Sequence, residues 1–363
     1  MRAFRSLSSW VVIAAVAGLS VLGAGCKREP EARGPDAPLR LGFFPNITHA
    51  QALVGNAEGT FTSQPGVGPL KVMQFNAGPA AMEALVAGSL DVSYVGSGPA
   101  INTFLKAGRE LRIIAGAVNN GAVLVVRTVK TPAELKGKKL ASPQLGNTQD
   151  IALRYWLQQQ GLSTHLDGTG DVQIFPLSNP DILGQFLRGG IEGAWVPEPW
   201  GARLVAEGHG RILVNERDLW PGGRFPITVL VTTRKVLETQ RPRVVALLRA
   251  HVRLTERWED DPAGFTTAAN AAFGQLTSKP LPPAILQQAF SRLEPSLDPV
   301  PQALATAAEH ARSLGFITDA NLDGLVDLSL LDEARATAAL PGGGRWDTAG
   351  VTLSVPAGED ARP

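Results

Sequence analysis

The sequence has little of what covalent cross-links and metal sites need. It contains one cysteine, Cys26, in 363 residues, so no disulfide can form within the chain. Its five histidines are scattered without the spacing of metal ligands, and no second thiolate is present. The chain also lacks a G-x-S-x-G segment, a phosphate-binding loop and a dinucleotide fingerprint. We therefore expect no metal, no cofactor and no enzyme active site of these kinds.

Neither sign of charge dominates, and long apolar runs are scarce. Lys and Arg together number 34 and Asp and Glu 33, which gives a formal net charge of +1. A chain so balanced offers no basic face to nucleic acid or to a membrane surface. The apolar run from about Trp10 to Leu22 is shorter than the roughly 20 residues that a membrane-spanning helix needs. We therefore expect no nucleic-acid partner and no spanning segment.

That short apolar run has the features of an export signal. A basic segment, Met1–Arg5, comes before it, and the small residues Gly23-Ala24-Gly25 stand directly before Cys26. This order predicts a lipoprotein signal peptide over residues 1–25, a lipid on Cys26 and a tether over 26–38. We therefore expect a periplasmic or otherwise extracytoplasmic protein, anchored by lipid to a bacterial membrane. The alternative is an ordinary cleaved signal with a chance cysteine near the cut.

Beyond the tether, strand-like apolar runs alternate with helix-like segments. The alternation restarts near residue 125, returns near residue 228 and gives way to helical patterns, the first over 244–258. Alternation with short turns predicts an α/β fold of βαβ units and mostly parallel sheets. We expect lobe one over residues 39–122 and 229–335, lobe two over 123–228 and a flexible tail over 336–363. Two strand crossings would form the hinge, with the ligand between the lobes.

Polar turns follow several of the predicted strands. A helix start leaves backbone N–H groups without partners and carries partial positive charge, so converging helix starts bind an anion without a net positive surface. Parallel strands with similar crossovers bring such turns to one edge of a sheet. The candidates in these turns are Asn46, His49, Asn76, Ser97, Gly98, Gly146, Asn147, Thr148 and Gln149. For the segment Ser142–Gln149 the alternative is a plain helix cap without a ligand, for Asn46 it is a helix cap, and for His49 it is a structural role.

The segment Ala194-Trp195-Val196-Pro197-Glu198-Pro199-Trp200 is a further candidate, because its prolines exclude a regular helix throughout. Trp195 is expected either to form an apolar wall for a ligand or to pack in the core. Glu198 is expected either to bond a ligand ammonium or hydroxyl group or to cap the following helix. A carboxylate in an anion site is unfavourable unless it is paired or the ligand carries a donor.

Four segments together resemble the solute-binding lipoproteins of ABC importers, in the nitrate, aliphatic-sulfonate and taurine branch. They are Leu41–Gly55, Phe75–Ala81, Ser142–Asp150 and Ala194–Trp200, and Asn215–Pro221 is also similar. The resemblance implies a type II periplasmic-binding-protein fold and a monomer that delivers a small anion to a membrane permease driven by an ATPase. It is most similar to the aliphatic-sulfonate members.

By that similarity, five of the candidates would face the sulfonate group, namely Asn46, Ser97, Asn147, Thr148 and Gln149. Trp195 and Glu198 would line the organic end. The solute in this branch varies among sulfonates, nitrate, bicarbonate and other small solutes. A related branch of the same fold makes a thiamine pyrimidine precursor with a cysteine-rich motif, which this chain lacks. A sensor that presents its ligand to a receptor is a further alternative.

Overall fold

The computed structural model describes residues 37–337, all within one compact unit. The expected signal peptide, Cys26 and most of the tether lie outside the described residues, as do residues 338–363 of the expected tail. Within the described range, none of the helices has the length and apolar composition needed to cross a membrane.

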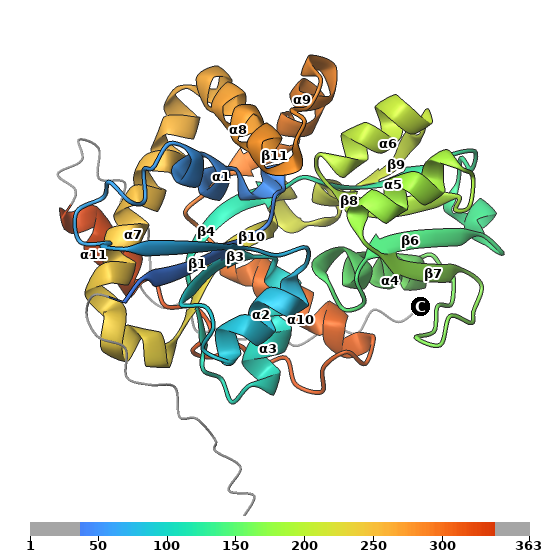
Figure 1. Cartoon of the computed structure of the whole chain (residues 1–363). Helices are drawn as coiled ribbons and strands as arrows, with labels where there is room; N and C mark the ends of the chain where they lie inside the picture. Colours follow the sequence, from blue (N-terminus) through green and yellow to red (C-terminus); the bar gives the residue numbers. More distant parts are fainter. Residues whose placement is uncertain (1–36, 338–363) are drawn as a thin grey trace, which may run out of the picture. The chain divides into compact units, whose positions relative to one another are not determined.

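Two sheets organise this unit (Figure 1). The first has six strands in the order β11-β4-β10-β3-β1-β2. They are β1 Leu39–Phe43, β2 Leu70–Gln74, β3 Val92–Val95, β4 Leu111–Asn120, β10 Pro226–Thr233 and β11 Leu293–Pro295. The second has five strands in the order β7-β6-β8-β5-β9. They are β5 Ala122–Val126, β6 Lys139–Pro143, β7 Gln173–Leu177, β8 Gly193–Pro197 and β9 Arg211–Asn215.

Each sheet is mixed, and the prediction of mostly parallel sheets is wrong. β1 pairs in parallel with β2 and β3, whereas β10 runs antiparallel to both of its neighbours and β11 runs antiparallel to β4. In the second sheet β6 pairs in parallel with β7 and β8, but β5 is antiparallel to β8 and β9. The reason is the connection between sheets: β5 enters the second sheet directly from β4, and β10 returns to the first, without the crossover helix that keeps successive strands parallel.

The two connections between the sheets lie side by side. Only Gly121 separates β4 from β5, so the chain crosses from the first sheet to the second at this glycine. The return runs from β9 through the short 3-10 turns η3 Glu216–Leu219 and η4 Pro221–Gly223 to β10. The backbone N–H of Asn120 donates to the carbonyl of Phe225 at 2.9 Å, which joins the crossings. The lobe boundaries and the motion between lobes stay predictions.

Helices cover both faces of the first sheet because side chains alternate along its strands. In β10, Val229 and Val231 pack with α2 Gly78–Val86, α3 Ser97–Lys106 and α10 Pro301–Ser313. Leu230 lies in the cluster on the opposite face. That face carries the 3-10 turn η1 Ile47–His49 and the helices α1 Ala50–Ala57, α7 Arg234–Asp260 and α8 Pro262–Thr277 (Figure 1). Two further helices in this part of the chain are α9 Pro283–Phe290 and α11 Ser329–Thr337.

The second sheet is covered in the same way. Val123 and Val125 of β5 pack with α5 Asn179–Leu187 and α6 Trp200–Gly208. Leu124 of the same strand shares a cluster with α4 Thr148–Gln159, which lies on the other side of the sheet (Figure 1). A 3-10 turn, η2 Pro132–Leu135, precedes β6. The sequence expectation of alternating strands and helices is thus confirmed in both sheets.

The C-terminal helices differ most from expectation. α7 begins at Arg234, well before the predicted start at 244, because Thr233 caps it: its Oγ1 accepts from the N–H of Val236 at 3.3 Å. Pro242 stands inside this helix, where it removes one backbone donor. The carbonyl of Glu238, four residues earlier in the helix, therefore lacks its usual helical hydrogen bond. The strand β11 and the helix α11 were not predicted.

Candidate functional site

The first turns of α3 and α4 meet, although they follow strands of different sheets. The backbone N–H of Gly98 donates to Oγ1 of Thr148 at 3.1 Å. A Cβ atom on Gly98 would lie 3.0 Å from the Thr148 Cα, and one on Gly96 would lie 2.7 Å from Oγ1. A residue larger than glycine at position 96 or 98 would therefore push the two helix starts apart. Ser97 and Thr148 are both buried at this junction.

A buried carboxylate holds the loop that leads into α4. Oδ1 of Asp150 accepts from Ser142 Oγ at 2.6 Å, and Oδ2 accepts from the N–H of Gly146 at 2.9 Å. The Nε of Arg154 lies 3.2 Å from both oxygens, and both of these charged side chains are buried. Asn147 caps the helix, with Oδ1 accepting from the N–H of Thr148 at 2.9 Å. The loop is thus fixed from inside, and its tip faces the start of α3.

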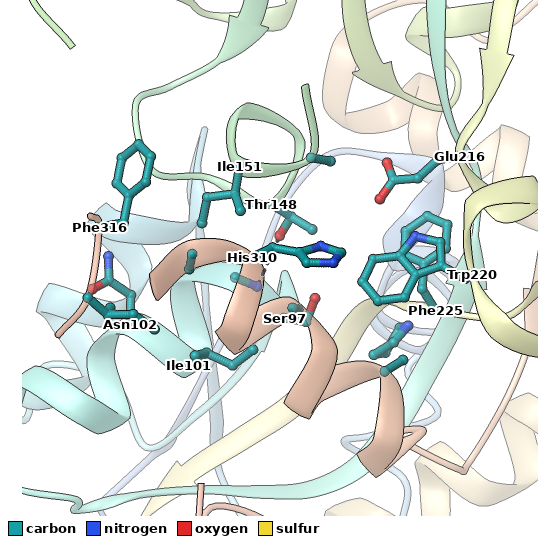
Figure 2. Close-up of a pocket in the computed structure, with 17 residues that line it drawn as sticks. Ser97, Ile101, Asn102, Thr148, Ile151, Glu216, Trp220, Phe225, His310 and Phe316 are labelled. Atoms are coloured by element: carbon teal, nitrogen blue, oxygen red, sulfur yellow. Dashed lines mark hydrogen bonds between the residues drawn. The ribbon is translucent and has the colours of Figure 1, made fainter. Parts of the chain in front are cut away.

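A small cavity of about 30 Å³ lies beside this junction (Figure 2). A water molecule needs roughly 10–15 Å³ of such volume, so the cavity has room for about two. Its wall is mostly apolar, and the residues that line it include Ser97, Gly98, Ile101, Asn102, Thr148, Ile151, Glu216, Trp220, Phe225, His310 and Phe316. Among the described residues that line it, none is Lys or Arg.

Glu216 is the charged residue in this wall. It is 1% exposed, and its Oε2 accepts from the indole N–H of Trp195 at 2.6 Å. By hydrogen-bond geometry its Oε1 has no partner among the described residues, although the indole of Trp220 is close enough to lower the pKa of Glu216. Burial raises the pKa of Glu216 to about 7, and the indole groups of Trp195 and Trp220 oppose that rise. Figure 2 shows the carboxylate pointing into the space beside Thr148 and Trp220.

A row of aromatic rings continues the wall. His310 of α10 stacks on Tyr155 of α4, with ring centroids 3.5 Å apart, and lies 5.6 Å from Trp220. Trp220 in turn stacks on Phe225 with centroids 5.4 Å apart. Burial lowers the pKa of His310 to about 4, so the ring is neutral at pH 7. α10 thereby packs against elements of both sheets at this cavity.

A larger cleft of about 740 Å³ lies at the ends of β1, β2 and β7. Asn46 and Asn76 line it, together with Asn179 and Arg203. The buried Oδ1 atoms of Asn46 and Asn179 have no hydrogen-bond partner among the described residues. The starts of α2 and α3 touch each other, since a Cβ atom on Gly78 would lie 2.3 Å from Cγ of Pro99.

Six of the eleven candidate residues line neither cavity, and three of these six contact only other parts of the protein interior. His49 is buried under Phe44, whose N–H donates to its Nδ1 at 3.4 Å, and burial lowers its pKa to about 3. Trp195 is fully buried and reaches the small cavity only through Glu216. Glu198 is also buried: its Oε2 accepts from the N–H of Ala202 at 2.9 Å, and its Oε1 pairs with Arg292 at 2.5 Å.

Of the other candidates, the structure brings Ser97, Gly98 and Thr148 together at the small cavity and Asn46 with Asn76 at the larger cleft. Gly146, Asn147 and Gln149 are buried around the start of α4. Sequence reasoning missed Glu216, Trp220 and His310 as lining residues. A signal existed for Glu216, which directly follows a strand as the other candidates do, but none existed for His310 within a long helical segment.

Residues 32–272 match the NMT1-like family. A taurine-binding periplasmic protein of Escherichia coli K12 is 29% identical over 199 residues, which cover 53% of this chain and 58% of that protein. The chain thus spans about half the length of the curated relatives it matches.

Two solved structures are similar. The alkanesulfonate-binding protein SsuA from Xanthomonas axonopodis pv. citri, bound to MOPS, has a TM-score of 0.67 at 22% identity over 82% of this chain and 99% of its own. The periplasmic nitrate-binding protein NrtA from Synechocystis PCC 6803 has a TM-score of 0.71 at 16% identity over 84% and 89%. These likenesses confirm the α/β, type II periplasmic-binding-protein fold expected from the sequence.

Proposed function

The chain belongs to the NMT1-like family, and from that premise we propose that it is the solute-binding protein of an ABC importer. It captures a small organic anion, an aliphatic sulfonate first of all, between its two sheets and releases it unchanged. Relatives and structural neighbours named for taurine, alkanesulfonate and nitrate binding support this proposal. The partners are a membrane permease and its ATPase, and the protein acts as a monomer without catalysis.

The observation that carries the proposal is the meeting of α3 and α4. Two helix starts from different sheets come together at one place, where the Gly98 N–H donates to Oγ1 of Thr148. An oxyanion can replace that bond and accept from both groups. The charge comes from helix dipoles, which explains how an anion site works although no Lys or Arg is among the described residues that line the cavity.

Capture requires that the ligand contact both sheets. A solute held by α3 alone has equal affinity for open and closed forms and shifts no equilibrium between them. A sulfonate that also accepts from Thr148 favours the closed form by that added contact. The cavity of about 30 Å³ is too small for such a solute, so binding moves the two helix starts apart from their present contact.

Replacing Thr148 by valine tests this role of the helix starts. Valine has a similar size but no hydroxyl, so we expect the affinity for ethanesulfonate to fall by roughly 1–3 kcal/mol, the value of a buried hydrogen bond. Isothermal calorimetry on the purified protein measures this change in affinity. Nitrate and bicarbonate are titrated in parallel with ethanesulfonate. Thr267→Val, on the exposed face of α8, is the matched control and should bind as the wild type does. Unchanged affinity in Thr148→Val contradicts the proposed site, and no binding of any of the three anions contradicts the function.

The location is a second part of the proposal. We place the protein outside the cytoplasm, held by a lipid on Cys26, a residue outside the described range. Cys26→Ser removes the only thiol of the chain, so we expect the protein to move from the membrane fraction to the soluble fraction. Cell fractionation with immunoblotting measures the change. A Cys26→Ser variant that stays in the membrane fraction rules out the anchor but not solute binding.

A further inference from the structure

Glu216 is a buried carboxyl group in the wall of the proposed anion site. It is 1% exposed and lines the small cavity together with Ser97, Gly98 and Thr148 at the helix starts. The side chain is held in place, because the indole N–H of Trp195 donates to its Oε2 at 2.6 Å. Figure 2 shows the carboxylate pointing toward Thr148. An anion at the starts of α3 and α4 therefore lies close to this carboxyl group.

The carboxyl group has no counter-charge in the cavity. Among the described residues that line it, Glu216 is the only acid, and none is Lys or Arg. Two negative charges in one poorly hydrated site repel each other strongly, and a carboxylate so placed takes up a proton instead. Protonation also changes its hydrogen bonding, because a neutral carboxyl group has one O–H donor whereas a carboxylate only accepts. The neutral acid can therefore bind the same anion that the carboxylate repels.

We propose that Glu216 binds the anion as the neutral acid, donating its O–H to an oxyanion at the starts of α3 and α4, so that capture takes up a proton. The proposal rests on the proposed function and adds a proton dependence to it. The proton comes from water or buffer, stays on Oε1 while the anion is bound and returns when the anion leaves. Oε2 still accepts from Trp195, and the hydroxyl oxygen keeps a lone pair for the indole of Trp220.

The burial of Glu216 supports this role. Burial raises its pKa to about 7, although the indoles of Trp195 and Trp220 oppose that rise. A substantial share of the free protein therefore already carries the proton at pH 7. An anion beside the group raises the pKa further in the bound state. Because the bound pKa is the higher one, affinity is greatest below the pKa of the free protein and falls as the pH rises through it.

The other charged and titratable side chains around Glu216 are accounted for. Asp150 and Arg154 pair with each other, as do Glu309 and Arg312. His310 lines the cavity, but burial lowers its pKa to about 4, so it stays neutral from pH 6 to 8.5. The full set on the described elements packed around Glu216, to which β5 and β8 contribute none, is Arg217 and Asp218 of η3, Arg211 of β9, Arg224 before β10, Lys106 of α3, Asp150, Arg154 and Tyr155 of α4, and Glu309, His310 and Arg312 of α10.

Ethanesulfonate and nitrate are the probes, because both are anions of strong acids and keep their charge throughout this pH range. For the wild type we expect binding about tenfold or more weaker at pH 8.5 than at pH 6, since tenfold corresponds to a pKa difference of one unit between bound and free protein. Isothermal calorimetry measures the affinities. Calorimetry at pH 7.5 in phosphate and in Tris, whose ionisation enthalpies differ, should also show proton uptake on binding.

Glu216→Gln separates the proton from the shape of the side chain. Gln has a similar size, keeps an acceptor for Trp195, and its amide donates at every pH. We expect its affinity for ethanesulfonate to change by about twofold or less from pH 6 to 8.5, and to exceed that of the wild type at pH 8.5. A side chain that only packs would give no such gain. Glu238→Gln removes the same charge from an exposed position on α7 and should keep the wild-type pH profile.

The outcomes separate this inference from the proposed function. If the wild type binds ethanesulfonate equally well at pH 6 and 8.5, or takes up no proton, Glu216 is not a proton-dependent ligand and anion capture stands. A Glu216→Gln variant that keeps the wild-type pH profile, or binds no more tightly than the wild type at pH 8.5, also overturns the inference. If neither anion binds at any pH, both proposals fall. Should Glu216→Gln not fold, the pH profile and proton exchange of the wild type decide.

Discussion

Replacing Arg292 by methionine is expected to lower the free energy of unfolding by about 3–5 kcal/mol at pH 7, the usual cost of breaking one side of a buried ion pair. Glu198 is fully buried, and its Oε1 is held by Arg292 at 2.5 Å. Methionine keeps much of the apolar stem of arginine but leaves the carboxylate buried without its cation. Urea unfolding followed by circular dichroism measures the loss.

The dependence on pH identifies the cause. Burial raises the pKa of Glu198 above its ordinary value, and Arg292 opposes that rise. Without Arg292 the folded-state pKa rises further, so the carboxyl is protonated in the folded state over a wider range. A group with a raised folded pKa stabilises the fold fully below its unfolded pKa and loses that contribution as pH rises. The loss of unfolding free energy in Arg292→Met should therefore be small near pH 5 and reach its full value at pH 7 to 8.

The double variant Arg292→Met with Glu198→Gln is the control for this pair. It removes both charges, and Gln keeps an acceptor for the N–H of Ala202. Most of the lost stability should return, because removal of a whole buried pair is often close to neutral. A deficit that is independent of pH, or a double variant as unstable as the single one, contradicts the argument.

The position of the α3 and α4 starts at the carboxyl ends of strands could be predicted because its causes are local, whereas their meeting depends on how the two sheets pack. Gly96-Ser97-Gly98 follows β3 directly, Gly146-Asn147-Thr148 begins three residues after the last residue of β6, and parallel strands of a βαβ unit end at one edge of their own sheet. The strand–turn–helix pattern therefore places these residues at the carboxyl edge without knowledge of any distant contact. The same reasoning applies to Asn46 and Asn76, which line the larger cleft.

The partners of buried charges could not be predicted in this way. Arg292 is 94 residues from Glu198 along the chain, and no local pattern relates an arginine after α9 to a carboxylate after β8. Glu216 and Trp195 are 21 residues apart: Trp195 lies in the central strand β8, and Glu216 follows β9. Such pairs depend on how the strands and helices of the whole fold pack together. The sequence therefore predicted Glu198 as a lining residue and gave no indication that Arg292 is its partner.

The second large effect is expected from Asp150→Asn. This change should lower the free energy of unfolding by about 3–5 kcal/mol, because it leaves the guanidinium of Arg154 buried without a counter-charge. Arg154 is 3% exposed and Asp150 is 0% exposed. Asn offers one oxygen in place of two, so the donors Ser142 Oγ and Gly146 N–H also compete for one acceptor. Thermal and urea unfolding measure the loss.

A pair with the same helical spacing on the surface serves as control. Arg203 and Glu207 are also four residues apart, but they are 27% and 35% exposed, so Glu207→Gln should cost only about 0–1 kcal/mol. Because Asp150 also holds the loop at Gly146, the substitution Asp150→Asn should affect ligand binding as well as stability. Once its brace from Asp150 is gone, the start of α4 is held less firmly, so ethanesulfonate affinity should fall under conditions where Asp150→Asn is still folded. If folded Asp150→Asn binds ethanesulfonate with full affinity, the contacts of Asp150 with the loop at Gly146 serve stability alone. If Asp150→Asn loses no more stability than Glu207→Gln, the burial of the Asp150–Arg154 pair does not determine its contribution to stability.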